Sequence, residues 1–296
     1  MSGARVLAVG LAVLDKIFGV DEIPRAAIKV FATSYREIGG GPAATGAVTV
    51  ARLGGRAALW TRVGGDGVGE RIVAELRDWG VDVTAGVQEA RGSNVSGVLV
   101  DRAGERLIVS FTDPALDPDP GWLPLDGMAA DALLCDVRWP AGAQAAMRRA
   151  RRLGIPTILD ADLAPADVTG ALLPLADHAV FSEPALARLT GLPDRAAALE
   201  ACRAACPGTV GVTLGDEGYL WCDAGGLHHE PAFPVEVVDT LGAGDVFHGA
   251  YALAIAEKRT VAEAARFANA AAALKCARSG GRAGIPTRAE VDALTR

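Results

Sequence analysis

The sequence predicts an α/β protein with a mostly parallel sheet. From about residue 130, short apolar runs alternate with helical segments, and the runs ADALLCDV, IPTILDAD and DHAVFS are continuously apolar. Such runs are typical of parallel strands that are covered on both faces. Two segments, near residues 12–38 and 94–112, interrupt this order because their side chains alternate between apolar and polar, which indicates half-exposed strands.

Composition limits the possible classes of protein. The 296 residues, 50% hydrophobic and 22% charged, suit one large domain over residues 1–296. The net charge of −7 and the lack of a basic run disfavour nucleic acid as a partner. No window approaches the ~18 apolar residues of a membrane helix. Five cysteines form no metal pattern, and their odd number without a signal peptide indicates a reducing cytoplasm.

The N-terminal third predicts three strands and two helices. Residues 5–9 form an apolar first strand, and Asp15 follows near its carboxyl end, where open α/β sheets bind ligands. Residues 29–38 alternate like a strand and lead into Gly39, Gly40 and Gly41. These glycines allow the backbone to approach a ligand closely, and the next residue, a proline, suits the first position of a helix. Residues 57–63 form another strand before an amphipathic helix.

The rest of the chain continues the pattern. Residues 96–100 and 106–111 alternate around the turn 101–104, which predicts a hairpin. Further strands with glycine turns follow residue 208, and residues 260–278 have the composition and period of a helix. Residues 280–286, GGRAGIP, predict a loop.

The most informative stretch is DTLGAGDVFHGA, residues 239–250. It follows an alternating segment, PVEVVD, with the character of a strand and precedes a helical segment. Gly242, Ala243 and Gly244 let the chain turn sharply, and the unpaired N–H groups of a helix starting there would bind an anion such as a phosphate. Asp245 falls in the first turn, so we expect it to be ionised at neutral pH and able to accept a proton from a hydroxyl.

Two other nucleotide-binding classes lack their motifs. No G-x-x-x-x-G-K-[ST] sequence occurs, which disfavours a P-loop NTPase. No G-x-G-x-x-G sequence occurs either, which disfavours a Rossmann dehydrogenase.

Residues 239–245 resemble the D-T-x-G-A-G-D signature of the ribokinase-like (PfkB) carbohydrate kinases. The resemblance implies a three-layer α/β/α sandwich with a small β-sheet lid built by the two interrupting segments. It also implies ATP and Mg²⁺ as cofactors, Asp245 as catalytic base and the Gly242–Gly244 amides as an anion hole. By the same resemblance Asp15 binds sugar hydroxyls. Residues 39–44 resemble the family's G-G-x-x-x-N motif, although its Asn is Ala44 here.

The resemblance also predicts the nucleotide site. VTLGDEG, residues 212–218, resembles the family's nucleotide segment, which makes nucleotide-binding candidates of Thr213, Gly215 and Gly218. Asn269 lies where the family lines the adenine pocket, with an ordinary packing role as the equal alternative, and Gly280 begins a loop expected beside the nucleotide. The family's metal-associated N-x-x-E motif falls on Ser182 and Ala185 here. Glu183 is the nearest carboxylate and could serve the metal through water.

A finer resemblance concerns the sugar. GGGPAATGA, CDVRW, FSEPALARLTG and ALKCARSGGRAGIP are similar to the 6-deoxy-6-sulfofructose kinases. In that subgroup a Lys, an Asn and an Arg hold the sulfonate, and the matching positions are Lys29, Ser110 and Arg138. This predicts phosphorylation at carbon 1 of 6-deoxy-6-sulfofructose. Because Ser110 replaces the Asn, another acidic or 6-substituted ketose stays open.

Alternatives to the sulfonated ketose are a kinase for a neutral sugar or sugar acid, such as fructose or 2-keto-3-deoxygluconate, and one for a phosphorylated ketose. A non-catalytic sensor is disfavoured by the intact Asp245, and a nucleoside kinase by the 5% aromatic content. The resemblance also implies a homodimer that pairs through the lid, since half-exposed sheets often carry apolar outer faces.

Overall fold

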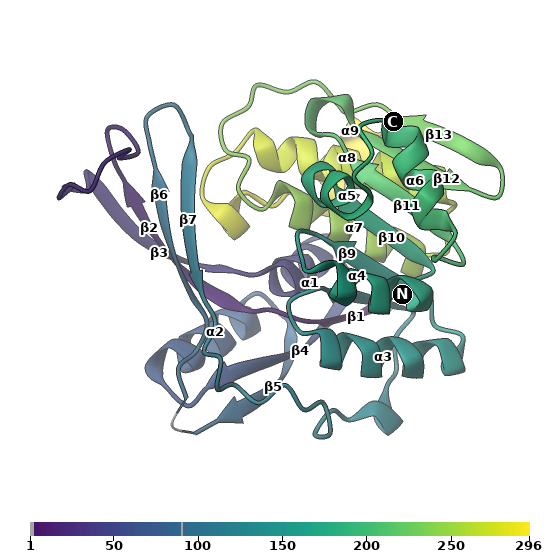
Figure 1. Cartoon of the computed structure of the whole chain (residues 1–296), viewed down its shortest axis with the longest axis horizontal. Coiled ribbons are helices and arrows are strands. Elements are labelled where there is room, and N and C mark those ends of the chain that lie inside the picture. Colours follow the sequence, from purple (N-terminus) through teal and green to yellow (C-terminus); the bar gives the residue numbers. More distant parts are fainter. Residues whose placement is uncertain (1–2, 90) are drawn as a thin grey trace.

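The α/β architecture is confirmed. The computed structural model describes residues 3–89 and 91–296. It contains a large sheet with helices on both faces and a smaller sheet that stands beside it (Figure 1). The predicted three layers and small second sheet are therefore both present.

The large sheet has the strand order β13-β12-β11-β10-β9-β8-β1-β4-β5. Seven neighbouring strands run parallel: β11, β10, β9, β8, β1, β4 and β5. Strands β12 and β13 add an antiparallel edge. The strands are β1 (Arg5–Val9), β4 (Arg56–Gly64), β5 (Asp82–Gln88), β8 (Ala132–Asp136), β9 (Thr157–Ala161), β10 (His178–Ser182), β11 (Thr209–Thr213), β12 (Tyr219–Asp223) and β13 (Gly226–Glu230).

Helices cover both faces of the large sheet and form two hydrophobic cores, with α1, α2, α7, α8 and α9 in one and α3 to α6 in the other. Among the described residues, no helix is long and apolar enough to cross a membrane. The helices are α1 (Pro42–Arg52), α2 (Gly67–Asp78), α3 (Pro140–Leu153), α4 (Ala166–Leu172), α5 (Glu183–Thr190), α6 (Arg195–Arg203), α7 (Ala243–Ala256), α8 (Val261–Cys276) and α9 (Arg288–Leu294).

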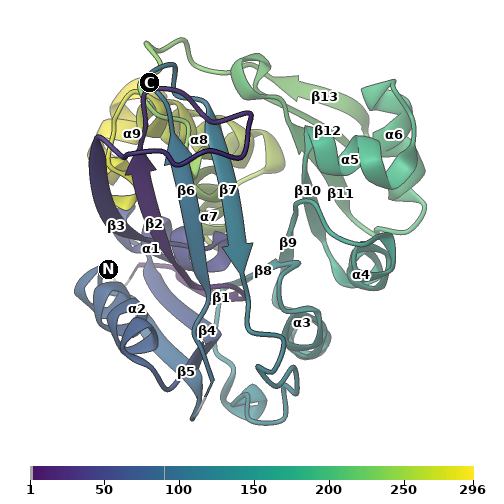
Figure 2. The same ribbon diagram turned by 60° about the vertical axis from the view of Figure 1, so that its left-hand side comes forward.

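The smaller sheet, called the lid sheet below, has the order β3-β2-β6-β7 and its strands lie side by side in Figure 2. They are β2 (Val13–Gly19), β3 (Ser34–Gly40), β6 (Val95–Val100) and β7 (Arg106–Phe111). The register aligns Asp15 with Ser96, and Ser96 with Ser110. Because paired residues share a face, these three polar side chains form one row across the lid sheet.

Two predicted strands are wrong in part. Strand β3 begins at Ser34, so residues 29–33 belong to the loop before it, and Lys29 is exposed there. Residues 234–239, PVEVVD, form no strand. The N–H groups of Val238 and Asp239 bind the carbonyl of Cys276 at the end of α8 instead of a neighbouring strand. An alternating pattern can therefore describe an extended segment that packs on a helix.

Helix α7 carries the stretch that follows the Gly-Ala-Gly turn, and it is buried along most of its length. It packs against α1 and α8. A side chain at Gly249 would place its Cβ 2.5 Å from the carbonyl oxygen of Gly46 in α1. The small residue therefore lets the two helices approach closely.

We predict that Gly249→Ala lowers the free energy of unfolding by about 1–3 kcal/mol, because the added methyl group overpacks the contact between α1 and α7. Urea denaturation would measure this. The matched control is Gly170→Ala in α4, where a Cβ meets nothing within 4 Å. That change should be neutral or stabilising by up to about 1 kcal/mol. Equal stability of the two variants would contradict the close packing.

Candidate active site

The N-terminus of α7 forms the centre of the site. Gly242 precedes the helix with φ of 74°, a left-handed conformation that favours glycine. Ala243 is the first helical residue and Asp245 lies in the first turn. The first N–H groups of a helix have no partner within it, so this turn presents donors and the positive end of the helix dipole. An anion hole at Gly242, Ala243 and Gly244 has this geometry.

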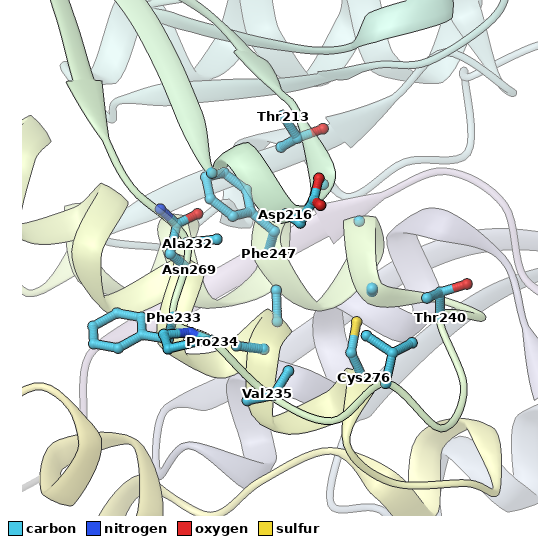
Figure 3. A pocket seen from close by; sticks show the side chains of 17 residues that line it. Thr213, Asp216, Ala232, Phe233, Pro234, Val235, Thr240, Phe247, Asn269 and Cys276 are labelled. Carbon is cyan, nitrogen blue, oxygen red and sulfur yellow. The ribbon is translucent and has the colours of Figure 1, made fainter.

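A cavity of ≈ 580 Å³ lies on one side of this turn (Figure 3). Ala243 and Gly244 line it, together with three of the residues predicted to bind a nucleotide, Thr213, Gly215 and Gly218. Most of the remaining wall is apolar: Ala232, Phe233, Pro234, Val235, Val237, Phe247, Ala272 and Ala273. An apolar cavity that ends at a helix N-terminus suits a flat base with phosphates attached.

The other two nucleotide candidates are placed differently. Asn269 lines the larger cavity, but its amide donates hydrogen bonds to the carbonyls of Glu230 (2.9 Å) and Pro231 (3.1 Å). It therefore holds the segment that forms the cavity wall. Gly280 lies just before a short turn of 3₁₀ helix, η4 (Gly281–Gly284), and is absent from the wall of this cavity.

A smaller cavity of ≈ 50 Å³ lies on the lid side of the same turn. Asp245 and Gly242 line it, together with four more of the residues predicted to bind the substrate, Asp15, Gly39, Gly40 and Gly41. Its remaining polar lining was not predicted from the sequence: Thr45, Lys275 and Arg282. The two cavities are adjacent because one turn borders both. Ala243 and Gly244 line the larger cavity, and Gly242 and Asp245 line the smaller one.

The consecutive glycines are needed for protein packing. A Cβ at Gly40 would collide with the carboxylate of Asp15, and a Cβ at Gly39 would collide with the side chains of Glu75 and Arg282. Gly41 has φ of 96° and lies against the backbone of Leu11. The glycines therefore let charged side chains pack directly on the backbone beside the cavity.

Arg282 joins the base of the lid sheet to the body of the protein. Its guanidinium is buried and donates to Glu75 Oε2 (2.5 Å), to the Gly40 carbonyl (2.8 Å) and to Thr45 Oγ1 (3.4 Å). A charged residue inside the small-residue run GGRAGIP was the only sequence signal for this role.

Asp15 is half-buried on β2, and burial raises its pKa to about 6. A hydrogen bond from Ser96 and the charge of Arg282 oppose this rise. Ser96 Oγ lies 3.2 Å from Ser110 Oγ, so the row across the lid sheet is hydrogen-bonded. Such a row offers one carboxylate and two hydroxyls to a ligand rich in hydroxyl groups.

Asp245 is less acidic than its place at a helix N-terminus led us to expect. Burial raises its pKa to about 7, and the charge of Asp160 adds to the rise while His248 opposes it. Desolvation therefore outweighs the stabilisation that the helix N-terminus offers to a carboxylate. A carboxylate with a pKa near 7 is better matched to proton transfer at neutral pH than an ordinary one.

A second layer of polar groups lies beneath Asp245. His248 Nδ1 lies 3.4 Å from Asp160 Oδ2, and His248 Nε2 faces the Val180 carbonyl at 3.3 Å. Burial raises the pKa of Asp160 and lowers that of His248. Both groups act on Asp245, whose pKa Asp160 raises and His248 lowers.

The three residues predicted to hold a sulfonate are absent from the wall of the smaller cavity. Lys29 is exposed with its Nζ 5.6 Å from the centre of the Phe31 ring. Ser110 is bonded to Ser96, as described above. Arg138 donates to Asp162 Oδ2 (2.7 Å) and to the Leu163 carbonyl (2.9 Å). Each of these side chains therefore has its contacts elsewhere.

A magnesium ion would find few ligands in the protein itself. Within residues 3–89 and 91–296, no three His, Cys, Asp or Glu side chains are grouped so as to hold a metal. Mg²⁺ commonly keeps several waters and binds through one or two carboxylates and the phosphates of a nucleotide. Asp162 fits this use because it is half-exposed and its charge acts on both Asp160 and Asp245. Both Asp162 and Glu183 already have an arginine partner, since Arg195 Nε donates to Glu183 at 2.7 Å and Arg138 donates to Asp162 at 2.7 Å.

Comparisons with known proteins agree with this geometry. A model of the pfkB family of carbohydrate kinases matches residues 4–288. The ribokinase of Bacillus subtilis is 30% identical over 293 residues, 98% of each chain. The crystal structure of a candidate ribokinase from Agrobacterium tumefaciens is 42% identical with a TM-score of 0.94, covering 100% of this chain and 98% of that one. An Arabidopsis thaliana ribokinase complexed with ribose and ATP is 26% identical with a TM-score of 0.84, covering 100% and 99%.

This chain belongs to the pfkB family and is a carbohydrate kinase. The resemblance of residues 239–245 to that family is confirmed. The relatives named above are described as ribokinases, so the finer resemblance to sulfofructose kinases is not confirmed.

We predict that kcat/KM rises with pH and levels off above about 7. A base works only when it is ionised, so the raised pKa of about 7 at Asp245 means that activity is lost as the pH falls through that value. Initial rates between pH 5 and 9 would measure this. Asp15→Asn is the control, because it removes the other carboxyl group with a raised pKa. This variant should have lower activity, but the pH at which activity is lost should stay the same. A limb near pH 4 would contradict the burial of Asp245.

Proposed function

We propose that the protein transfers the terminal phosphoryl group of ATP to a hydroxyl group of a sugar. The observation that carries this proposal is the position of Asp245 in the partition between two cavities, one suited to a nucleotide and one lined by Asp15. A base and a phosphate cradle that share one helical turn can act on the same pair of reacting atoms.

The proposed step is an in-line displacement. The sugar oxygen gives its proton to the Asp245 carboxylate and forms a bond to the terminal phosphorus of ATP. The bond from that phosphorus to the bridging oxygen breaks, and ADP leaves with the electron pair. The N–H groups at the start of α7 stabilise the charge on the transferring group. Asp162 is the carboxylate that would help to hold Mg²⁺, and that ion would neutralise charge on the phosphates.

A neutral sugar is the first candidate for the acceptor. The smaller cavity is lined by Asp15, which Ser96 and Ser110 extend into a row of hydroxyl-binding groups. Arg282, the cation beside it, already has three protein partners. Relatives described as ribokinases and as a fructokinase of Zea mays, 28% identical over 291 residues, support a pentose or hexose.

The second candidate is 6-deoxy-6-sulfofructose, phosphorylated at carbon 1. One structural observation favours it besides the motifs. The N–H of Arg138 binds Asp136, which also accepts the N–H groups of Leu11 and Ala43. The backbone of Arg138 is therefore anchored at the edge of the large sheet from which the lid sheet extends. A sulfonate could replace Asp162 as the partner of its guanidinium, since both offer paired oxygens.

We predict that ATP turnover with Mg²⁺ is faster for ribose or fructose than for 6-deoxy-6-sulfofructose, fructose 6-phosphate or 2-keto-3-deoxygluconate, compared as kcat/KM. Asp245→Asn should abolish turnover of every sugar while nucleotide binding, measured by calorimetry, persists. Undiminished turnover by that variant would remove Asp245 from the mechanism.

Arg138→Ala separates the two candidates within the same assay. For a neutral acceptor, KM should stay unchanged, as it should in the control Arg148→Ala, whose arginine pairs with Gln144 on α3. For a sulfonated acceptor, KM should rise by about 10- to 100-fold, the usual effect of losing a charged hydrogen bond. A sulfosugar preference together with that rise would overturn the neutral-sugar proposal.

We also infer that the lid sheet pairs with a second copy of this chain. The face opposite the Asp15 row exposes apolar side chains, including Tyr35, Leu107, Val109 and Phe111. A two-sided sheet with one apolar face open to water is unusual in a monomer.

We predict that Val109→Glu converts a dimer to a monomer, because it places a charge in the centre of this apolar face. Light scattering coupled to size-exclusion chromatography would measure the mass. Val109 is 64% exposed, and the matched control Val87→Glu changes a 54% exposed valine on β5 of the large sheet. A monomeric wild-type protein, or a dimer that survives Val109→Glu, would refute pairing through this face.

A further inference from the structure

Lys275 is a buried lysine that has no part in the transfer step proposed above. Its side chain is 1% exposed, in the last turn of α8. Placing an ammonium group in the interior is costly unless it is well paired. Among the residues that the structure describes, Nζ makes one hydrogen bond, to the Asp239 carbonyl at 3.0 Å, and Asp239 Oδ2 lies at 3.7 Å. An ammonium has three donors, so its pairing within the protein is incomplete.

The position of Lys275 explains why this charge could be useful. It lines the smaller cavity together with Gly242 and Asp245, whereas its neighbour Cys276 lines the larger one near Thr240 (Figure 3). The end of α8 therefore underlies the partition between the two cavities. The phosphoryl group must cross that partition during the proposed transfer.

Several contacts tie the loop before α7 to this end of α8. The Cys276 carbonyl accepts the N–H groups of Val238 (2.8 Å) and Asp239 (3.0 Å), and Lys275 binds the Asp239 carbonyl. On the other side, Arg106 of the lid sheet contacts the Thr240 hydroxyl. The loop that sets the direction of the anion hole is thus held between a buried cation and a cation from the lid.

We propose that Lys275 is an electrostatic positioning residue for phosphoryl transfer. Its ammonium holds Asp239, and with it residues 240–242, so that the N–H groups of α7 point at the transferring group. Its full positive charge beneath the partition also stabilises the negative charge there, adding to the partial charge of the helix N-terminus. This inference rests on the proposed kinase function and adds a residue to it.

Two neutral variants test the charge. Lys275→Met keeps the length of the side chain, and Lys275→Ala leaves a space that n-propylammonium can fill. We expect Lys275→Met to lower kcat by about 100-fold while KM for ATP changes less than about threefold, the pattern of an interaction made in the transition state. Lys258→Met, at an exposed lysine beyond the end of α7, is the control and should keep wild-type kcat.

Rescue separates charge from packing. For Lys275→Ala, n-propylammonium should restore kcat at least about tenfold, whereas n-propanol at the same concentration should not, because only the amine replaces the lost charge. Equal rescue by the alcohol would overturn the proposal, since the lysine would then only fill space. A kcat of Lys275→Met within threefold of wild type would overturn it as well.

Folding and function are checked in the same experiment. Thermal melting of each variant shows whether it folds, and if neither neutral variant folds, the ammonium is a structural requirement and the proposal is overturned. Turnover of the wild-type protein tests the proposed function by itself. An active wild type with an equally active Lys275→Met removes only the role of Lys275, whereas an inactive wild type removes the kinase proposal.

Discussion

The site depends on a carboxylate held out of water at the first turn of a buried helix. Helix α7 packs against α1, α8 and the sheet, which hold the partly buried turn at its start in place. Burial raises the pKa of Asp245 to about 7, which makes it a base suited to neutral pH. The N–H groups at the start of α7 lie beside this carboxyl group. One turn would therefore provide both the proposed base and the proposed anion hole.

The lid sheet supplies the other half of the site. The row from Asp15 to Ser110 crosses it, and Arg282 joins its base to the body by binding Glu75 and the Gly40 carbonyl. The lid would thus position the proposed sugar-binding groups against the start of α7, while a nucleotide would enter from the other side of the partition. Separate entry for the two substrates is consistent with direct transfer between them.

Sequence patterns predicted the parts of the site that are made by backbone geometry. The glycines before α7 and the continuously apolar strands have direct physical signals, so the α/β class and the position of Asp245 followed from them. The buried charges had little signal: a charged residue within GGRAGIP marked Arg282 and nothing marked Lys275, because both contact partners more than thirty residues away. The pKa of Asp245 could not be predicted either, since burial depends on the packing of several helices. The alternation of residues 234–239 was misleading because a helix, and no strand, binds that segment.

The most direct test is a crystal structure of the protein with a non-hydrolysable ATP analogue and the sugar that it phosphorylates. The account predicts one sugar oxygen within about 3 Å of the Asp245 carboxylate and the terminal phosphate at the N–H groups of Ala243 and Gly244. A sugar bound away from Asp245, or a phosphate bound away from the start of α7, would contradict the account.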